Sequence, residues 1–164
     1  MKEEGKLRKQ LVAYLKQGYA HSPFEDIVAD FPIDQINSKA PNSSYTPYRL
    51  LEHIRITQWD ILDFIRNPKY KYMNWPKDYW PKEGKIATRS DWIKIIKSFK
   101  KDLKELIKII SNPKTDLLAK IPHGEGQTVL KEILVIIDHN AYHLGEFGIL
   151  RDVMKTWGKN KKTV

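Results

Sequence analysis

The sequence contains no cysteine. This absence excludes disulfides, cysteine-ligated zinc, iron–sulfur clusters and a thiol nucleophile supplied by the chain itself. Long apolar runs are also absent, since the longest on helix-like sequence, Ile133 to Ile137, is far shorter than the ~20 residues of a membrane span. The N-terminus is charged and has no apolar segment behind it, so it does not predict a secretory signal. These features predict an intracellular, cytoplasmic protein with no membrane partner.

Acidic residues are outnumbered by basic ones, 20 against 29, and the formal net charge is +9. Such an excess can attract nucleic acid. The lysines are spread over the polar faces of predicted helices, however, and only the tail 155–162 is locally basic with no acidic residue. We therefore interpret the charge as a solvated, lysine-rich surface and not as a nucleic-acid site.

The sequence also lacks the period-two alternation of strands, because no stretch alternates convincingly between apolar and polar residues. Four segments instead have helical periodicity, at about 3–18, 47–66, 89–111 and 128–157. With 164 residues and 41% hydrophobic residues, the chain predicts one domain, 1–164. The predicted fold is all-α, a single-domain four-helix bundle with long connections at 20–46 and 67–87, which do not force an up-down order.

Local signals set the expected helix ends. Thr46 and either Thr88 or Ser90 are candidate N-caps, Asn67-Pro68 and Asn112-Pro113 are breakers, and Gly158 is the expected stop of the last helix. A short extra helix is predicted around 24–30. The apolar stripe of the first helix is predicted to contain Leu7, Leu11, Tyr14, Leu15 and Gly18.

Histidines are the first candidates for chemistry. His139 and His143 stand four residues apart on a predicted helix, so both imidazoles can reach one ion, although two partly exposed helix histidines would show the same spacing. His53 lies on the core-facing side of the second helix, where a hydrogen-bonded core histidine is the alternative. Together the three residues predict a divalent-metal site, and three protein ligands leave room for a reactant, as in catalytic sites.

Two carboxylates follow these histidines on the same faces. Asp60 comes two turns after His53, and Glu146 comes three residues after His143. Each could orient a ligand histidine or act as a base on bound water, or could be a boundary carboxylate paired with a lysine. Glu132 is a weaker candidate, because a carboxylate near a helix start is favoured by the helix dipole anyway.

An aromatic, proline-containing loop at 69–81 is interpreted either as a cover for one end of the bundle or as a wall of a substrate pocket. Trp75 from this loop and Tyr142 beside the histidine pair are candidate pocket residues. His123 is a more distant candidate for the pocket, and His21 is expected to be structural.

Several of these runs together resemble the DinB/YfiT-like superfamily over about residues 21–157. The resemblance is carried by Leu50 to Arg55, Thr57 to Asp60, Trp75 to Pro81, Ile121 to Gly124 and Asp138 to Gly145. It implies a four-helix bundle with a non-up-down helix order, often a homodimer, and one divalent ion, zinc or nickel, held by His53, His139 and His143.

This chain departs from the superfamily pattern at three positions. Asn140 stands where many members have glutamate, and Tyr142 stands where many have a further histidine. Glu146 stands where members commonly have glutamine, which changes the charge near the ion.

The resulting hypothesis is a metal-dependent enzyme acting on a small-molecule substrate. A three-nitrogen site can lower the pKa of bound water toward about 7, which suits a hydrolase. It can equally ionise a thiol, and the resemblance implies a low-molecular-weight-thiol transferase as the other choice, with the thiol arriving as co-substrate. The alternative is a non-catalytic metal-binding or ligand-binding dimeric bundle. The residues do not choose among these.

Overall fold

The computed structural model describes residues 2–158 and contains five α-helices within them. These are α1 (Lys2–Gln17), α2 (Phe24–Val28), α3 (Pro47–Arg66), α4 (Arg89–Ser111) and α5 (Val129–Met154). Two short 3₁₀ helices, Ile33–Gln35 and Lys77–Tyr79, interrupt the connections. No strand forms among the described residues, so the predicted all-α class is confirmed. Over the same residues, no helix has the length and apolarity needed to cross a membrane.

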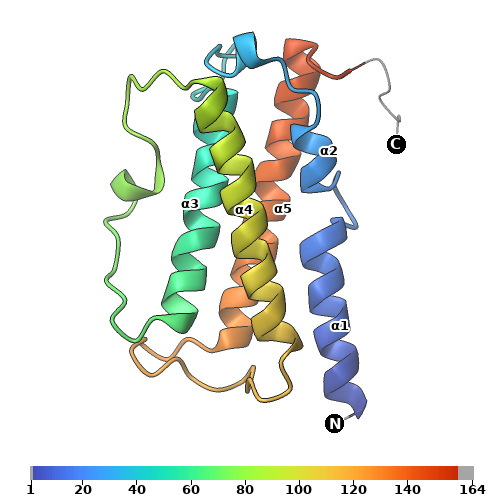
Figure 1. Ribbon diagram of the computed structural model, residues 1–164, viewed down its shortest axis with the longest axis vertical. Coiled ribbons are helices and arrows are strands. Elements are labelled where there is room, and N and C mark those ends of the chain that lie inside the picture. The colour runs from blue at the N-terminus through green and yellow to red at the C-terminus, as the bar shows by residue number, and fades with distance from the viewer. Residues whose placement is uncertain (1, 159–164) are drawn as a thin grey trace.

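The four long helices lie side by side (Figure 1). α3 packs against α4 and α5, and α1 packs against the same two helices. α3 and α4 run in the same direction, opposite to α1 and α5, because the connection 67–87 climbs back along the outside of α3 before α4 begins (Figure 1). The connection is therefore part of the packed structure beside α3.

Threonine caps begin the three helices that follow loops. The hydroxyls of Thr46, Thr88 and Thr128 each accept a hydrogen bond from a backbone N–H in the first turn of α3, α4 and α5. At α4 the side chain of Asp91 also accepts from the Thr88 backbone, which completes a capping box. Local capping thus sets the start of α3 and α4 where the sequence predicts it.

The core is densest around α3, whose Leu50, Leu51, Ile54 and Leu62 have no exposed surface. α2 adds Phe24, whose ring stacks on Phe99 of α4 with centroids 3.9 Å apart. Because α3 is surrounded by α4, α5 and the 67–87 connection, a polar residue on it needs a specific partner.

The end of α5 corrects the sequence prediction of a helix to about residue 157. α5 ends at Met154, because Lys155 adopts a left-handed conformation with φ 55°. The N–H of Thr156 donates to the Arg151 carbonyl and that of Lys155 to Asp152, the pattern of a Schellman motif. A left-handed conformation is unusual for a lysine and is normally taken by glycine. The prediction that the helix stops at Gly158 is therefore wrong, because Lys155 already ends it. Of the predicted basic tail 155–162, residues 159–162 lie outside the described residues.

Two further predictions, the apolar stripe of the first helix and the end of the short helix at 24–30, are corrected by the structure, and a buried arginine is involved in each case. Leu7 and Tyr14 are exposed, whereas Arg8 is 7% exposed and donates to the carbonyls at the end of α4, so the buried face of α1 is rotated from the predicted stripe. The short helix predicted at 24–30 ends at Val28, and the guanidinium of Arg151 donates to the carbonyls of Ile27 and Ala29 on either side of that end.

Candidate metal centre

Three histidines converge between α3 and α5. The Nε2 atom of His53 lies 3.2 Å from Nε2 of His143 and 3.1 Å from Nε2 of His139. One ring nitrogen from each residue fits within a common span of 4.8 Å. The sequence separations are 90 and 86 residues, so the packing of α3 on α5 creates the cluster.

Two of the three imidazole rings are held in place by a hydrogen bond from Nδ1, the ring nitrogen that points away from the cluster. Nδ1 of His53 lies 2.8 Å from the carbonyl oxygen of Tyr79, and Nδ1 of His143 lies 2.6 Å from Oε2 of Glu146. A carbonyl only accepts, and an ionised carboxylate only accepts, so each Nδ1 carries a proton. In the neutral rings, both Nε2 atoms are therefore bare lone pairs that point into the cluster.

Two bare lone pairs 3.2 Å apart repel unless a cation, or a proton shared between the two rings, lies between them. An extra proton is opposed at His53, because burial lowers the pKa of this residue. A divalent ion would attract both lone pairs. Two metal–nitrogen bonds of about 2.0–2.1 Å at a tetrahedral angle place the nitrogens about 3.3–3.4 Å apart, close to the 3.2 Å between these two atoms. The donor set therefore fits a zinc-like ion, and the group could hold one.

His139 completes the cluster in a different environment. Burial, with added repulsion from any charge on His143 and His53, lowers its pKa to about 3. Its Nδ1 is buried without a hydrogen-bond partner. The side chain of Asn140 acts on this half-buried imidazole by hydrogen bonding, and coordination of an ion through Nε2 would stabilise its neutral form further.

Glu146 is held by more than one donor. Beside His143, the hydroxyls of Tyr45 and Tyr142 interact with its carboxylate by hydrogen bonding, and its charge contributes to the raised pKa of both tyrosines. For Tyr45 the larger cause is burial. The carboxylate thus orients His143, as carboxylates behind metal-ligating histidines do, and is not a free base.

Asp60 does not touch the histidines. Its two carboxylate oxygens accept hydrogen bonds from Tyr70 at 2.8 Å and Tyr79 at 2.6 Å. Tyr79 in turn provides the carbonyl that fixes His53, so Asp60 acts on the cluster through the 67–87 connection. Trp80 of the same connection stacks on the His53 ring with centroids 4.0 Å apart.

The other predicted site residues lie at varying distances from the cluster. Tyr142 is 64% exposed and packs its ring against His143. Trp75 is exposed and contacts Tyr79, not a histidine of the cluster. His123 is not brought to the cluster: its Nε2 donates to the carbonyl of Phe64 near the opposite end of α3. His21 contacts the carbonyl of Ser22, as expected of a structural histidine.

Glu132 is buried near the start of α5, and burial raises its pKa. The charge of Asp60 acts on it in the same direction. No hydrogen bond to the three histidines places it in the centre, so it remains the weaker candidate.

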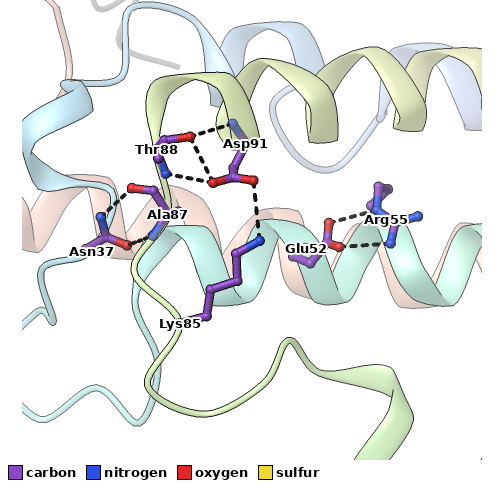
Figure 2. A network of polar contacts seen from close by, with 7 residues as sticks. All are labelled: Asn37, Glu52, Arg55, Lys85, Ala87, Thr88 and Asp91. Atoms are coloured by element: carbon purple, nitrogen blue, oxygen red, sulfur yellow. Dashed lines mark hydrogen bonds and ion pairs between the residues drawn. The ribbon is translucent and has the colours of Figure 1, made fainter.

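A separate polar cleft of about 290 Å³ lies between α3 and α4. Its charges largely satisfy one another: Arg55 binds both carboxylate oxygens of Glu52, and Lys85 lies 3.3 Å from Asp91 (Figure 2). None of the three histidines lines it. The cleft is therefore distinct from the candidate metal centre.

Three contributors to the centre were missed by sequence reasoning: the Tyr79 carbonyl, the Trp80 ring and the Tyr45 hydroxyl. A backbone carbonyl carries no residue-type signal, and its position depends on the path of the connection. Tyr45 precedes the Thr46 cap in an irregular segment, where no periodicity shows which way a side chain points.

Comparison of the chain with protein-family models, with curated proteins and with solved structures finds no match. The case for a metal centre consequently rests on the geometry of the three histidines and their partners.

Proposed function

We propose that the protein is a metal-dependent enzyme in which His53, His139 and His143 hold one zinc or nickel ion. The observation that carries the proposal is the pair of bare Nε2 atoms 3.2 Å apart, each fixed by an acceptor on its outer nitrogen. A DinB-like four-helix bundle is part of the same proposal. It is supported by the parallel course of α3 and α4 (Figure 1) and by the one-plus-two distribution of ligands over α3 and α5.

Access to the centre supports catalysis over a purely structural ion. The side chains of His143 and Glu146 are 14% and 27% exposed, so a small molecule can approach from their side. Three protein ligands leave at least one position for a reactant. When bound there, a divalent ion would supply Lewis acidity that lowers the pKa of a water or thiol.

Of the two reaction classes, the surroundings favour thiol transfer over hydrolysis. Glu146 is occupied by His143 and two tyrosine hydroxyls, and Asp60 by two other tyrosines, so neither carboxylate is poised as a base. A thiol with a pKa of about 8.5 needs far less help to ionise than water at 15.7.

In this reaction the thiol loses its proton to solvent, and its sulfur forms a bond to an electrophilic carbon of the second substrate. The leaving group departs from that carbon with the bonding electron pair. The chain's own part is to hold the three imidazoles, with His143 oriented by Glu146 and His53 oriented by Tyr79.

The test begins with tag-free protein purified without added metal. We expect elemental analysis to find about one divalent ion per chain, and thiol consumption with an electrophile panel to require that ion. Ester and amide panels report the hydrolase alternative. Turnover or metal content that survives in the H53A/H139A/H143A triple variant would contradict the proposal, and bound metal with no turnover would favour the non-catalytic bundle.

We also propose that the chain is a homodimer, as the resemblance implies, with α5 exposed residues in the interface. Val135, Tyr142 and Ile149 recur every seven residues and are each at least 40% exposed. An apolar stripe on one helix can pair with its own copy across a two-fold axis. Tyr142 contacts His143 and Glu146, so a second copy on this stripe would lie at the edge of the proposed metal centre.

Light scattering coupled to gel filtration tests the dimer. We expect twice the chain mass of 19.3 kDa for the wild type and the monomer mass for Ile149→Glu. Leu118→Glu is the matched control, because Leu118 is equally exposed but lies in the loop before α5. A wild type that is monomeric at tens of micromolar would rule the dimer out.

A further inference from the structure

The connection between α3 and α4, residues 67–87, forms a strap along the outer side of α3 (Figure 1). Apart from the short 3₁₀ helix Lys77–Tyr79, it has no regular structure of its own. Its position therefore depends on individual contacts, and several of these involve Tyr79 and its immediate neighbours.

Tyr79 binds two different groups on α3. Its hydroxyl donates to Asp60 at 2.6 Å, and its backbone carbonyl accepts from Nδ1 of His53 at 2.8 Å. Asp60 is only 5% exposed, so its carboxylate oxygens need the hydrogen bonds of the hydroxyls that reach them from the strap. One strap residue thus connects a buried carboxylate to a metal-ligand candidate.

Neighbouring contacts hold the same stretch of strap on His53. The Trp80 ring lies parallel to the imidazole, with an interplanar angle of 3°. Arg49, one turn before His53, donates to the carbonyl of Pro81 at 3.1 Å. The His53 ring therefore lies against the strap on one face and along one edge.

The strap's far end is fastened independently of the histidines. The side-chain amide of Asn37 makes two hydrogen bonds of 2.9 Å, one to the N–H and one to the carbonyl of Ala87 (Figure 2). Loss of the contacts around Tyr79 would thus free the middle of the strap and leave its C-terminal end in place.

We propose that docking of the strap and binding of a divalent ion to the three histidines are thermodynamically coupled, with Tyr79 as the positioning residue. This inference rests on the proposed metal centre. With the strap docked, the Tyr79 carbonyl keeps the proton on Nδ1 of His53 and presents Nε2 as the ligand atom. With the strap undocked, ring rotation and the other tautomer become available, and the ion loses an oriented donor.

Coupling of this kind is reciprocal: whatever the docked strap adds to metal affinity, the ion adds to strap docking. The first test therefore measures metal affinity. Titration with Zn²⁺ against a competing chelator, or with Co²⁺ by its visible absorption, compares the wild type with Tyr79→Phe and Tyr70→Phe. Both variants remove one hydroxyl from the same Asp60 carboxylate, but only Tyr79 also contacts His53.

We expect Tyr79→Phe to weaken metal binding about 10-fold, the usual effect of losing a partner behind a metal ligand, and Tyr70→Phe to weaken it by less than about 2-fold. Urea unfolding of the metal-free variants provides the matched readout. Similar losses of folding free energy in the two variants would show that the difference in affinity is not general destabilisation.

The second test measures strap docking in the wild type. Lys69, Lys71, Lys77 and Lys82 are exposed trypsin sites within the strap. Saturating Zn²⁺ is expected to slow cleavage there about 10-fold, the same factor as in the affinity test, and to leave cleavage at α1 lysines unchanged. Because this test needs no substitution, it decides the question even if Tyr79→Phe fails to fold.

The outcomes separate the two proposals. Equal metal affinities of the two tyrosine variants, or strap cleavage that ignores bound Zn²⁺, would overturn the coupling and leave the metal centre standing. Absence of Zn²⁺ and Co²⁺ binding by the wild type would overturn both.

Discussion

Replacing His53 by alanine is expected to weaken Zn²⁺ binding at least about 100-fold, because it removes one of three nitrogen donors and leaves a two-residue site on α5. The loss should also appear as stability. An ion at 100 times its dissociation constant stabilises the folded state by about 2.7 kcal/mol, which for this size is roughly 5–11 °C in melting temperature. That increment should vanish in the variant.

Calorimetric titration and thermal melting with and without chelator provide the measurements. His21→Ala is the control, because it removes an imidazole that bonds only to a neighbouring carbonyl, outside the cluster. It should bind Zn²⁺ like the wild type. A chelator-sensitive melting temperature in His53→Ala that matches the wild type would place the ion elsewhere on the chain.

Replacing Arg151 by methionine is expected to destabilise the fold by about 3 kcal/mol or more, since four backbone carbonyls each lose a charged donor. The side chain is 1% exposed and donates to the carbonyls of Asp26, Ile27, Ala29 and Thr156. It therefore joins the end of α2 and the segment after α5. Methionine preserves much of the volume and removes the donors.

Urea or thermal unfolding of metal-free protein gives the measurement, with an expected fall in melting temperature of roughly 6–12 °C. Arg66→Met is the matched control: its side chain is 45% exposed, and its ion pair with Asp63 spans 4.0 Å. A surface pair of this kind contributes at most about 1 kcal/mol. If the two variants unfolded alike, the carbonyls around Arg151 would have to be satisfied by other donors.

The bounds of the helices were largely predictable because they depend on near neighbours. α3 and α4 begin after threonines that cap them and end before Asn-Pro pairs that cannot continue a helix, and both coincide with the predicted ranges. The end of α5 was not predictable in the same way. Lys155 replaces the glycine that normally marks such a stop, and distant carbonyls hold Arg151 beside it.

The buried face of α1 is another limit of local reasoning. Helical periodicity predicts that Leu7 and Tyr14 belong to the buried stripe of the first helix and that Arg8 does not. In the structure the Arg8 guanidinium binds the carbonyls of Ile110 and Asn112 at the end of α4, which repays its burial. An arginine can be a core residue when it caps a neighbouring helix, and no pattern within α1 reveals that neighbour.

The helical class, most helix ends and the three histidines as candidate ligands were predictable from the residues alone, since side-chain type and spacing act over a few residues. The packing of α3 on α5 and of the 67–87 connection on α3 brings His53 to His139 and His143, lets Glu146 and Tyr79 fix two of the rings, and leaves His123 outside the cluster. The physical reason is that a neutral imidazole becomes a metal ligand through the acceptor behind its other nitrogen. Here one of those acceptors is a backbone carbonyl, placed by the path of the strap and not by any residue's identity.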